Sequence, residues 1–175
     1  MTVFGTACLY NVGFGSRDDD LGVASATVNV IVTGNATQLR SAGYWYNAYR
    51  DRRNQVFPAT TLACYLKIAG FMSTVFNERT NASTISLATR VLNPPGNVSA
   101  TEQFDRQLLA LWLNFANGPV DLTTLVDTNG DGVLDTALAT VLATAEAVRL
   151  DPASTSAQII AQKSIIERIN LRDGG

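Results

Sequence analysis

The spacing of apolar residues changes once along this chain, and that change constrains the fold more than any other feature. Residues 3–33 are rich in valine, threonine and aromatic residues in rough alternation, which is typical of β-strands. From residue 59 to residue 171 the apolar residues instead recur at the period of an amphipathic helix. The sequence therefore predicts a mainly α-helical protein that begins with a short β segment.

The β segment has the pattern of a hairpin. The polar stretch GSRDDDLG, residues 15–22, is bounded by glycine and separates the two strand-like runs. An isolated hairpin is marginally stable in water, so its apolar side chains need a cover. Because its outer edges also keep unpaired N–H and C=O groups, we expect copies of the chain to associate by strand addition. The apolar residues behind this expectation are Cys8, Tyr10, Val23, Ala26, Val28 and Val30.

Five helices are predicted between residues 59 and 171. Two of them open with the spacing of a capping box, which is Ser or Thr followed three residues later by Glu or Gln. These pairs are Ser99–Glu102 and Thr155–Gln158. Five helices with short connections form one compact domain. The predicted organisation is a hairpin at 1–34, a linker with an aromatic and basic segment at 35–58, and a helical domain with an EF-hand-like calcium loop at 59–175.

The composition excludes several classes of function. The chain of 175 residues has a net charge of −2, so no overall positive field attracts nucleic acid. It has no long apolar run, so no segment is expected to span a membrane. It also contains no histidine, which removes Ser-His-Asp and Cys-His catalysis and histidine-bound zinc.

The acidic segment LVDTNGDGVLD, residues 125–135, has the spacing of a calcium loop. Counted from its first aspartate, oxygen-bearing side chains occupy positions 1, 3, 5 and 9, glycine occupies position 6, and position 7 offers a backbone carbonyl. Position 12, normally a bidentate glutamate, is Leu138, so we do not expect a sensor that opens a helix pair. Glu146 is either a replacement ligand or a solvated residue, and we favour the second interpretation. The predicted Ca²⁺ ligands are Asp127, Asn129, Asp131, Val133 and Asp135.

A second candidate site is GYWYNAYRDRRN, residues 43–54, in which aromatic residues are interleaved with arginines. Aromatic faces beside guanidinium groups stack on sugar rings or bases. Large flat side chains also suit a junction between hairpin and helical domain, and we favour this structural interpretation. A solvated Trp45 would instead indicate binding. The residues concerned are Tyr44, Trp45, Tyr49, Arg50 and Arg53.

Several features are typical of an extracellular protein. Threonine, serine and asparagine are frequent and lysine is rare, yet MTVFGTACLY lacks the basic and apolar regions of a signal peptide. We therefore expect the chain to be the mature or C-terminal part of a longer secreted protein. In an oxidising compartment Cys8 and Cys64 form one disulfide, and the alternative is two small buried thiols.

Parts of this sequence resemble three known kinds of module. The helical part, residues 43–172, resembles a module from the C-terminal regions of large secreted or surface proteins of bacteria and archaea. That resemblance rests on GYW at 43–45, LLALWLNFANG at 108–118 and DTNGDG at 127–132. The hairpin resembles the closing strands of PKD-like and other immunoglobulin-like modules, and the acidic loop resembles the structural calcium loops of dockerins and thrombospondin-type repeats. The resemblances imply a non-catalytic appendage that follows an immunoglobulin-like sandwich.

The sequence thus predicts a non-catalytic extracellular structural or assembly module stabilised by Ca²⁺. Its expected partners are other domains or copies of the same surface protein. The alternative is an adhesion module that binds carbohydrate or protein through residues 44–53. A hydrolase is the least favoured function, because it needs two carboxylates in one cleft. The carboxylate pairs considered for it are Glu102 with Asp105 and Asp121 with Asp127.

Overall fold

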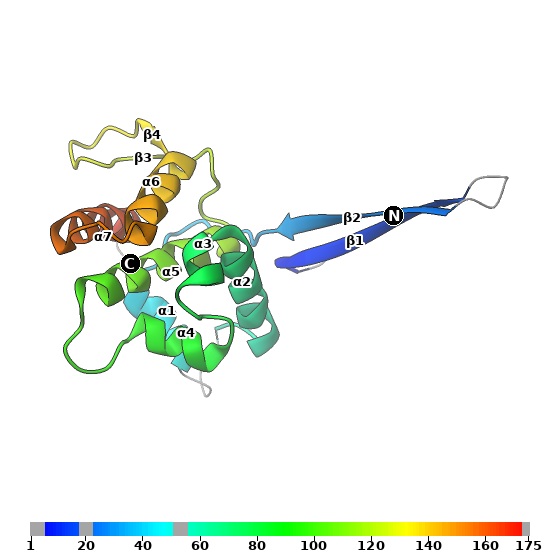
Figure 1. Cartoon of the computed structure of the whole chain (residues 1–175), viewed down its shortest axis with the longest axis horizontal. Coiled ribbons are helices and arrows are strands. Elements are labelled where there is room, and N and C mark those ends of the chain that lie inside the picture. Colours follow the sequence, from blue (N-terminus) through cyan, green and yellow to red (C-terminus); the bar gives the residue numbers. More distant parts are fainter. Residues whose placement is uncertain (1–5, 18–22, 51–55, 173–175) are drawn as a thin grey trace.

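The computed structural model describes residues 6–17, 23–50 and 56–172, and within them it contains seven helices, one long β-hairpin and one short strand pair (Figure 1). In chain order the elements are β1 (Cys8–Arg17), β2 (Val23–Val32), α1 (Ala42–Arg50), α2 (Ala59–Met72), α3 (Thr74–Glu78), α4 (Ile85–Leu92), α5 (Ala100–Asn117), β3 (Leu125–Val126), β4 (Thr136–Ala137), α6 (Leu138–Leu150) and α7 (Ser156–Leu171). The protein is therefore mainly helical with an N-terminal antiparallel hairpin, as the sequence predicts.

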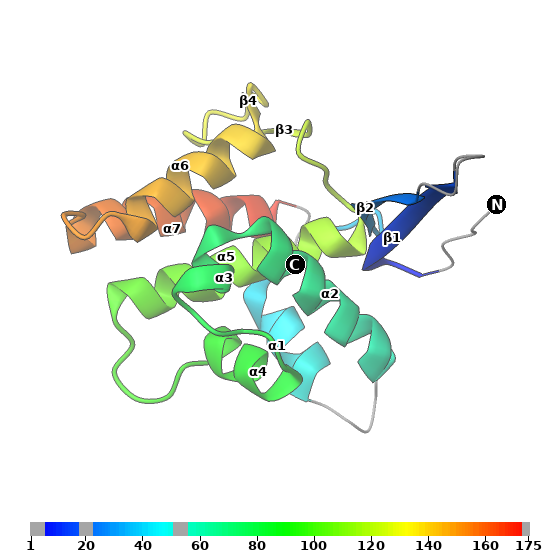
Figure 2. The same cartoon turned by 45° about the vertical axis from the view of Figure 1, so that its right-hand side comes forward.

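The helices α1 to α7 pack together into one unit, called here the helical body, and α5 runs through its middle. Every residue from 107 to 117 is buried, and a helix that is buried on all sides belongs in a core. Helix α7 packs on one side of α5 and is itself contacted by α6, while α1, α2 and α4 pack on the other side (Figure 2). The predicted capping box fixes the start of α5, because the Ser99 hydroxyl accepts the Glu102 N–H and the Glu102 carboxylate accepts the Ser99 N–H.

The prediction of five helices was too low, and Ser73 accounts for one additional helix. Its backbone is extended, with φ −102° and ψ 121°, and ends α2, although its N–H still donates to the Ala69 carbonyl. Its hydroxyl accepts the N–H of Phe76 and so caps the start of α3. One serine thus divides the long helix expected at this point into two.

Helix α1 is the second addition, and it lies in the segment predicted to be a linker. Ala42, Trp45 and Tyr49 are buried at the three- and four-residue spacing of a helix face. The Ser41 hydroxyl accepts the N–H of Tyr44 and caps the first turn. Both signals are local and present in the sequence. Helix α1 packs against α4 and α5 as part of the helical body.

The β1–β2 hairpin extends away from the helical body as a two-stranded arm (Figure 1). A disulfide between Cys8 and Cys64, with the two Cα atoms 4.7 Å apart, joins the base of β1 to α2. After β2 the chain hydrogen-bonds to the end of α5, where the Gly34 N–H donates to the Ala116 carbonyl at 2.8 Å. A Cβ on Gly34 would lie 2.4 Å from the Asn117 carbonyl oxygen, so this approach requires glycine. Of the two alternatives left open for the cysteines, the structure contains the disulfide.

The two faces of this arm differ in polarity. Cross-strand partners share a face, and one face carries the apolar pairs Tyr10↔Val30, Val12↔Val28 and Phe14↔Ala26. The other face carries the Asn11–Asn29 side-chain hydrogen bond and the pair Gly13↔Thr27, and Val23 also lies on it, opposite Arg17. On the apolar face Phe14 is 58% exposed and Val28 is 49% exposed. Within the described residues no further strand pairs with either edge of the arm.

Candidate functional site

The acidic loop lies between β3 and β4, whose antiparallel pairing brings its two ends together. Asp127 organises the turn, because its Oδ1 accepts the N–H groups of Asn129 at 3.0 Å and Gly130 at 2.6 Å. Its Oδ2 accepts the N–H of Gly132 at 2.9 Å. Gly132 has a φ of 85°, a left-handed value that favours glycine at position 6 of the loop. The loop is therefore built around the first of the predicted ligands.

The other predicted ligand side chains contact their neighbours in the loop. The Asn129 side-chain amide donates to Asp131 Oδ2 at 2.9 Å, and the Val133 N–H donates to Asp131 Oδ1 at 2.8 Å. Asp135 Oδ1 accepts the hydroxyl of Thr136 at 2.9 Å. Across residues 6–17, 23–50 and 56–172, no three acidic, cysteine or histidine side chains gather in a group that holds a metal. A cage here would also need oxygens from the Asn129 amide and the Val133 carbonyl.

Backbone donors and one arginine set the charge of the loop. The N–H groups of Gly130 and Gly132, followed by that of Asn129 and the positive charge of Arg168, lower the pKa of Asp127 below its ordinary value of 3.8. Asp127 is therefore ionised at neutral pH, which is the state a metal ligand requires. Arg168 of α7 donates to the Thr128 carbonyl at 2.8 Å and braces the loop against the helical body.

The residues expected near position 12 serve the core. Leu138 is fully buried at the start of α6. Glu146 is also buried, and its two oxygens accept the Trp112 indole N–H at 3.0 Å and the Thr74 N–H at 2.9 Å. The interpretation of Glu146 as a solvated residue is therefore wrong, because this carboxylate connects α6 to α5 and to the start of α3.

The aromatic and basic segment is divided between core and surface. Trp45 is fully buried, and Tyr49 is 3% exposed with its hydroxyl donating to the Leu62 carbonyl at 3.0 Å. Burial raises the pKa of Tyr49 well above 10.0. Tyr44 is half-buried, and Arg50 is exposed with its guanidinium 5.6 Å from the centre of a neighbouring tyrosine ring. Arg53 lies outside the described residues. Neither Trp45 nor Tyr49 offers a ring face to solvent.

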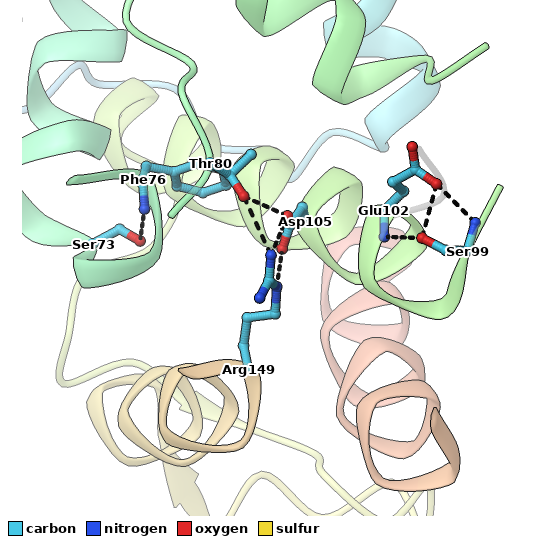
Figure 3. A network of polar contacts seen from close by, with 7 residues as sticks. All are labelled: Ser73, Phe76, Thr80, Ser99, Glu102, Asp105 and Arg149. Carbon is cyan, nitrogen blue, oxygen red and sulfur yellow. Dashed lines mark hydrogen bonds and ion pairs between the residues drawn. The ribbon is translucent and has the colours of Figure 1, made fainter. Parts of the chain in front are cut away.

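The carboxylates considered for hydrolysis all have structural partners. Glu102 and Asp105 both line a cavity of about 230 Å³ beside α4. Asp105, however, accepts Arg149 Nε at 2.7 Å and the Thr80 hydroxyl at 2.6 Å (Figure 3). Glu102 closes the capping box of α5, and the Ser99 N–H and hydroxyl lower its pKa.

In the second pair, Asp121 and Asp127, each carboxylate is also used in hydrogen bonds that shape a turn. Asp121 Oδ1 accepts the hydroxyl of Thr123 at 2.7 Å and the N–H groups of Thr123 and Thr124 at 2.8 Å each. These bonds, led by the Thr123 hydroxyl, lower the pKa of Asp121. Asp121 therefore shapes the turn before β3, and Asp127 shapes the loop after it.

Sequence reasoning missed a buried network of amides around α5. Asn114 is fully buried and hydrogen-bonds to Arg40, Trp45 and Asn170. Asn170 in turn donates to the Gln107 carbonyl at 3.0 Å. Polar residues in the middle of LLALWLNFANG were the available signal, because a polar residue on an otherwise apolar helix needs a buried partner.

Comparison with known proteins adds no relative to these observations: no family model matches the chain, and no curated protein or solved structure gives a match. The resemblances to surface-protein modules and to dockerin-type loops stay predictions. None of the helices in the described part of the chain is long and apolar enough to cross a membrane. The class that the fold defines is a mainly helical body with a projecting hairpin arm.

Proposed function

We propose that this protein is a non-catalytic structural or assembly module of an extracellular surface, and that Ca²⁺ stabilises its acidic loop. The observation that carries the proposal is Asp127, an ionised carboxylate at loop position 1 that accepts three backbone N–H groups. The ion would be held by the side-chain oxygens of Asp127, Asn129, Asp131 and Asp135 and by the Val133 carbonyl.

Two further observations favour this function. The Cys8–Cys64 disulfide suits an oxidising, extracellular compartment. A divalent cation in the loop would offset most of the negative charge of three neighbouring carboxylates. It would also hold β3 and β4 against α7, which already contacts the loop through Arg168. The expected role of the ion is therefore to fix the β3–β4 loop on the helical body.

Thermal unfolding with and without the ion tests the calcium proposal. An ion that binds only the folded state stabilises it by about 2.7 kcal/mol at a hundredfold excess over Kd. We expect a higher melting temperature in calcium than in EDTA. Asp127→Ala or Asp131→Ala should remove the difference, and Asp151→Ala, which changes an exposed aspartate outside the loop, should preserve it. Equal melting temperatures of the unsubstituted protein in calcium and EDTA would refute the proposal.

We further propose that copies of the chain, or neighbouring domains of the same surface protein, associate through the hairpin arm. Its apolar face is exposed, and its edges have no paired strand within the described residues. Val28 and Asn29 are adjacent in β2 but lie on opposite faces, so they form a matched pair of substitutions. We expect Val28→Lys to weaken association and Asn29→Lys to leave it unchanged in sedimentation velocity measurements. An unsubstituted protein that stays monomeric at high concentration would contradict this proposal.

A further inference from the structure

A cavity of about 410 Å³ lies where the chain leaves the hairpin arm and enters the helical body. Its wall combines residues of the segment after β2 with α1, α2 and the end of α5. This volume is in the range of small-ligand pockets. The side chains used below are Gln38, Arg40, Tyr44, Phe57, Tyr65 and Asn117.

Arg40 places a positive charge at this cavity, and no acidic side chain among the described residues forms an ion pair with it. Its guanidinium lies 4.7 Å from the centre of the Tyr44 ring. The ion pairs among the described residues are Arg149–Asp105 and Lys163–Glu167, and neither includes Arg40. The backbone of Arg40 is held in place, because buried Asn114 accepts its N–H at 2.9 Å and donates to its carbonyl at 2.8 Å.

The remaining wall supplies aromatic faces and amides. Tyr44 and Phe57 are half-buried and pack on the fully buried Trp45, with ring centres 5.5 Å and 5.7 Å from it. The Tyr65 hydroxyl donates to Asn117 Oδ1 at 2.9 Å. The Asn117 side-chain nitrogen makes no hydrogen bond within the described part of the chain, so it remains a donor for a ligand.

We propose that this cavity binds a carboxylate-bearing sugar ring, that is, a uronic acid residue. The Arg40 guanidinium pairs with the carboxylate of the sugar. The rings of Tyr44 and Phe57 pack against the apolar face of the sugar. Sugar hydroxyls both donate and accept, which matches the amides of Gln38 and Asn117. Arg40, which has no ion pair within the described residues, supplies one positive charge, and this matches the single charge of a carboxylate better than the double charge of a phosphate. The site uses no residue of the acidic loop or the arm, so it stands apart from the calcium and association proposals.

An NMR titration of the whole chain with glucuronate and galacturonate tests this site. The indole N–H resonance of Trp45, which underlies the aromatic wall, should shift with at least one of the two sugars. The indole N–H of Trp112, which bonds Glu146 and does not line the cavity, should stay in place. Neutral glucose has the sugar ring without the carboxylate, and free acetate has the carboxylate without the ring. Both should therefore bind at least about tenfold more weakly than the uronate.

Arg40→Gln and Arg50→Gln form the matched variants, because each removes one guanidinium that lies over a tyrosine ring. We expect Arg40→Gln to weaken uronate binding about tenfold or more, and Arg50→Gln to change it less than about twofold. Equal losses in the two variants would overturn the proposal. The proposal is also overturned if neither uronate shifts the Trp45 resonance at a sugar concentration of tens of millimolar, where even weak binding is detectable. If glucose or acetate binds as tightly as the uronate, the proposal is overturned as well. The comparison of sugars and acetate uses only the unsubstituted protein, so it does not depend on whether a variant folds.

Discussion

Asn114 offers the most direct test of how the helical body is held together. Its side chain is fully buried in α5. Oδ1 accepts the Arg40 N–H at 2.9 Å and the Trp45 indole N–H at 3.1 Å, while the amide nitrogen donates to the Arg40 carbonyl at 2.8 Å and to Asn170 Oδ1 at 3.0 Å. One side chain thus connects α5 with the segment before α1, with α1 and with α7.

The substitution Asn114→Leu keeps the branched shape of the side chain and removes all four of these hydrogen bonds. Each buried group left without a partner costs about 1–3 kcal/mol, so a simple sum is about 4–12 kcal/mol. Neighbouring losses are not additive and the site relaxes, so we expect a loss of about 4 kcal/mol or more in the free energy of unfolding. Total stability of a domain is about 5–15 kcal/mol, so this one substitution should bring the protein close to unfolding.

The control is Asn117→Leu, one turn further along α5. Within the described residues the Asn117 side chain makes one hydrogen bond, from the Tyr65 hydroxyl, so its replacement should cost about 1–3 kcal/mol. Urea unfolding followed by circular dichroism measures both variants. A loss of about 1 kcal/mol or less for Asn114→Leu, or a loss no larger than that of Asn117→Leu, would show that the buried amide network does not hold the helices together.

The disulfide and the capping box give two further predictions. The Cys8–Cys64 bond closes a loop with a sequence separation of 56, so its reduction should lower the free energy of unfolding by about 4 kcal/mol in the chain-entropy model; unchanged unfolding under reducing conditions would contradict this. Hydrogen bonds from Ser99 lower the folded-state pKa of Glu102 below its ordinary value of 4.5. The stability from this carboxylate is therefore fully present above pH 4.5 and is lost as the pH falls through the lower folded-state pKa. Glu102→Gln should flatten the stability profile in that acidic window, and an unchanged profile would refute the assignment.

Local signals in the sequence determined where most elements begin and end. The capping boxes Ser99–Glu102 and Thr155–Gln158 are both present, because each involves groups only three residues apart. The alternation of apolar residues predicted the hairpin for the same reason. The additional helix α1 was also readable, since Ser41 and the helical spacing of the buried aromatic residues are local signals.

Tertiary structure alone decided which distant partners satisfy the buried polar residues. Glu146 has the sequence environment of an exposed helix residue, but it is buried because its partners Trp112 and Thr74 are 34 and 72 residues away in the chain. Asn114 meets Arg40 across 74 residues. A buried polar group is stable only when a partner satisfies it, and partners this distant are brought into place by the packing of whole helices. Their pairing therefore follows from the fold and has no local pattern in the sequence.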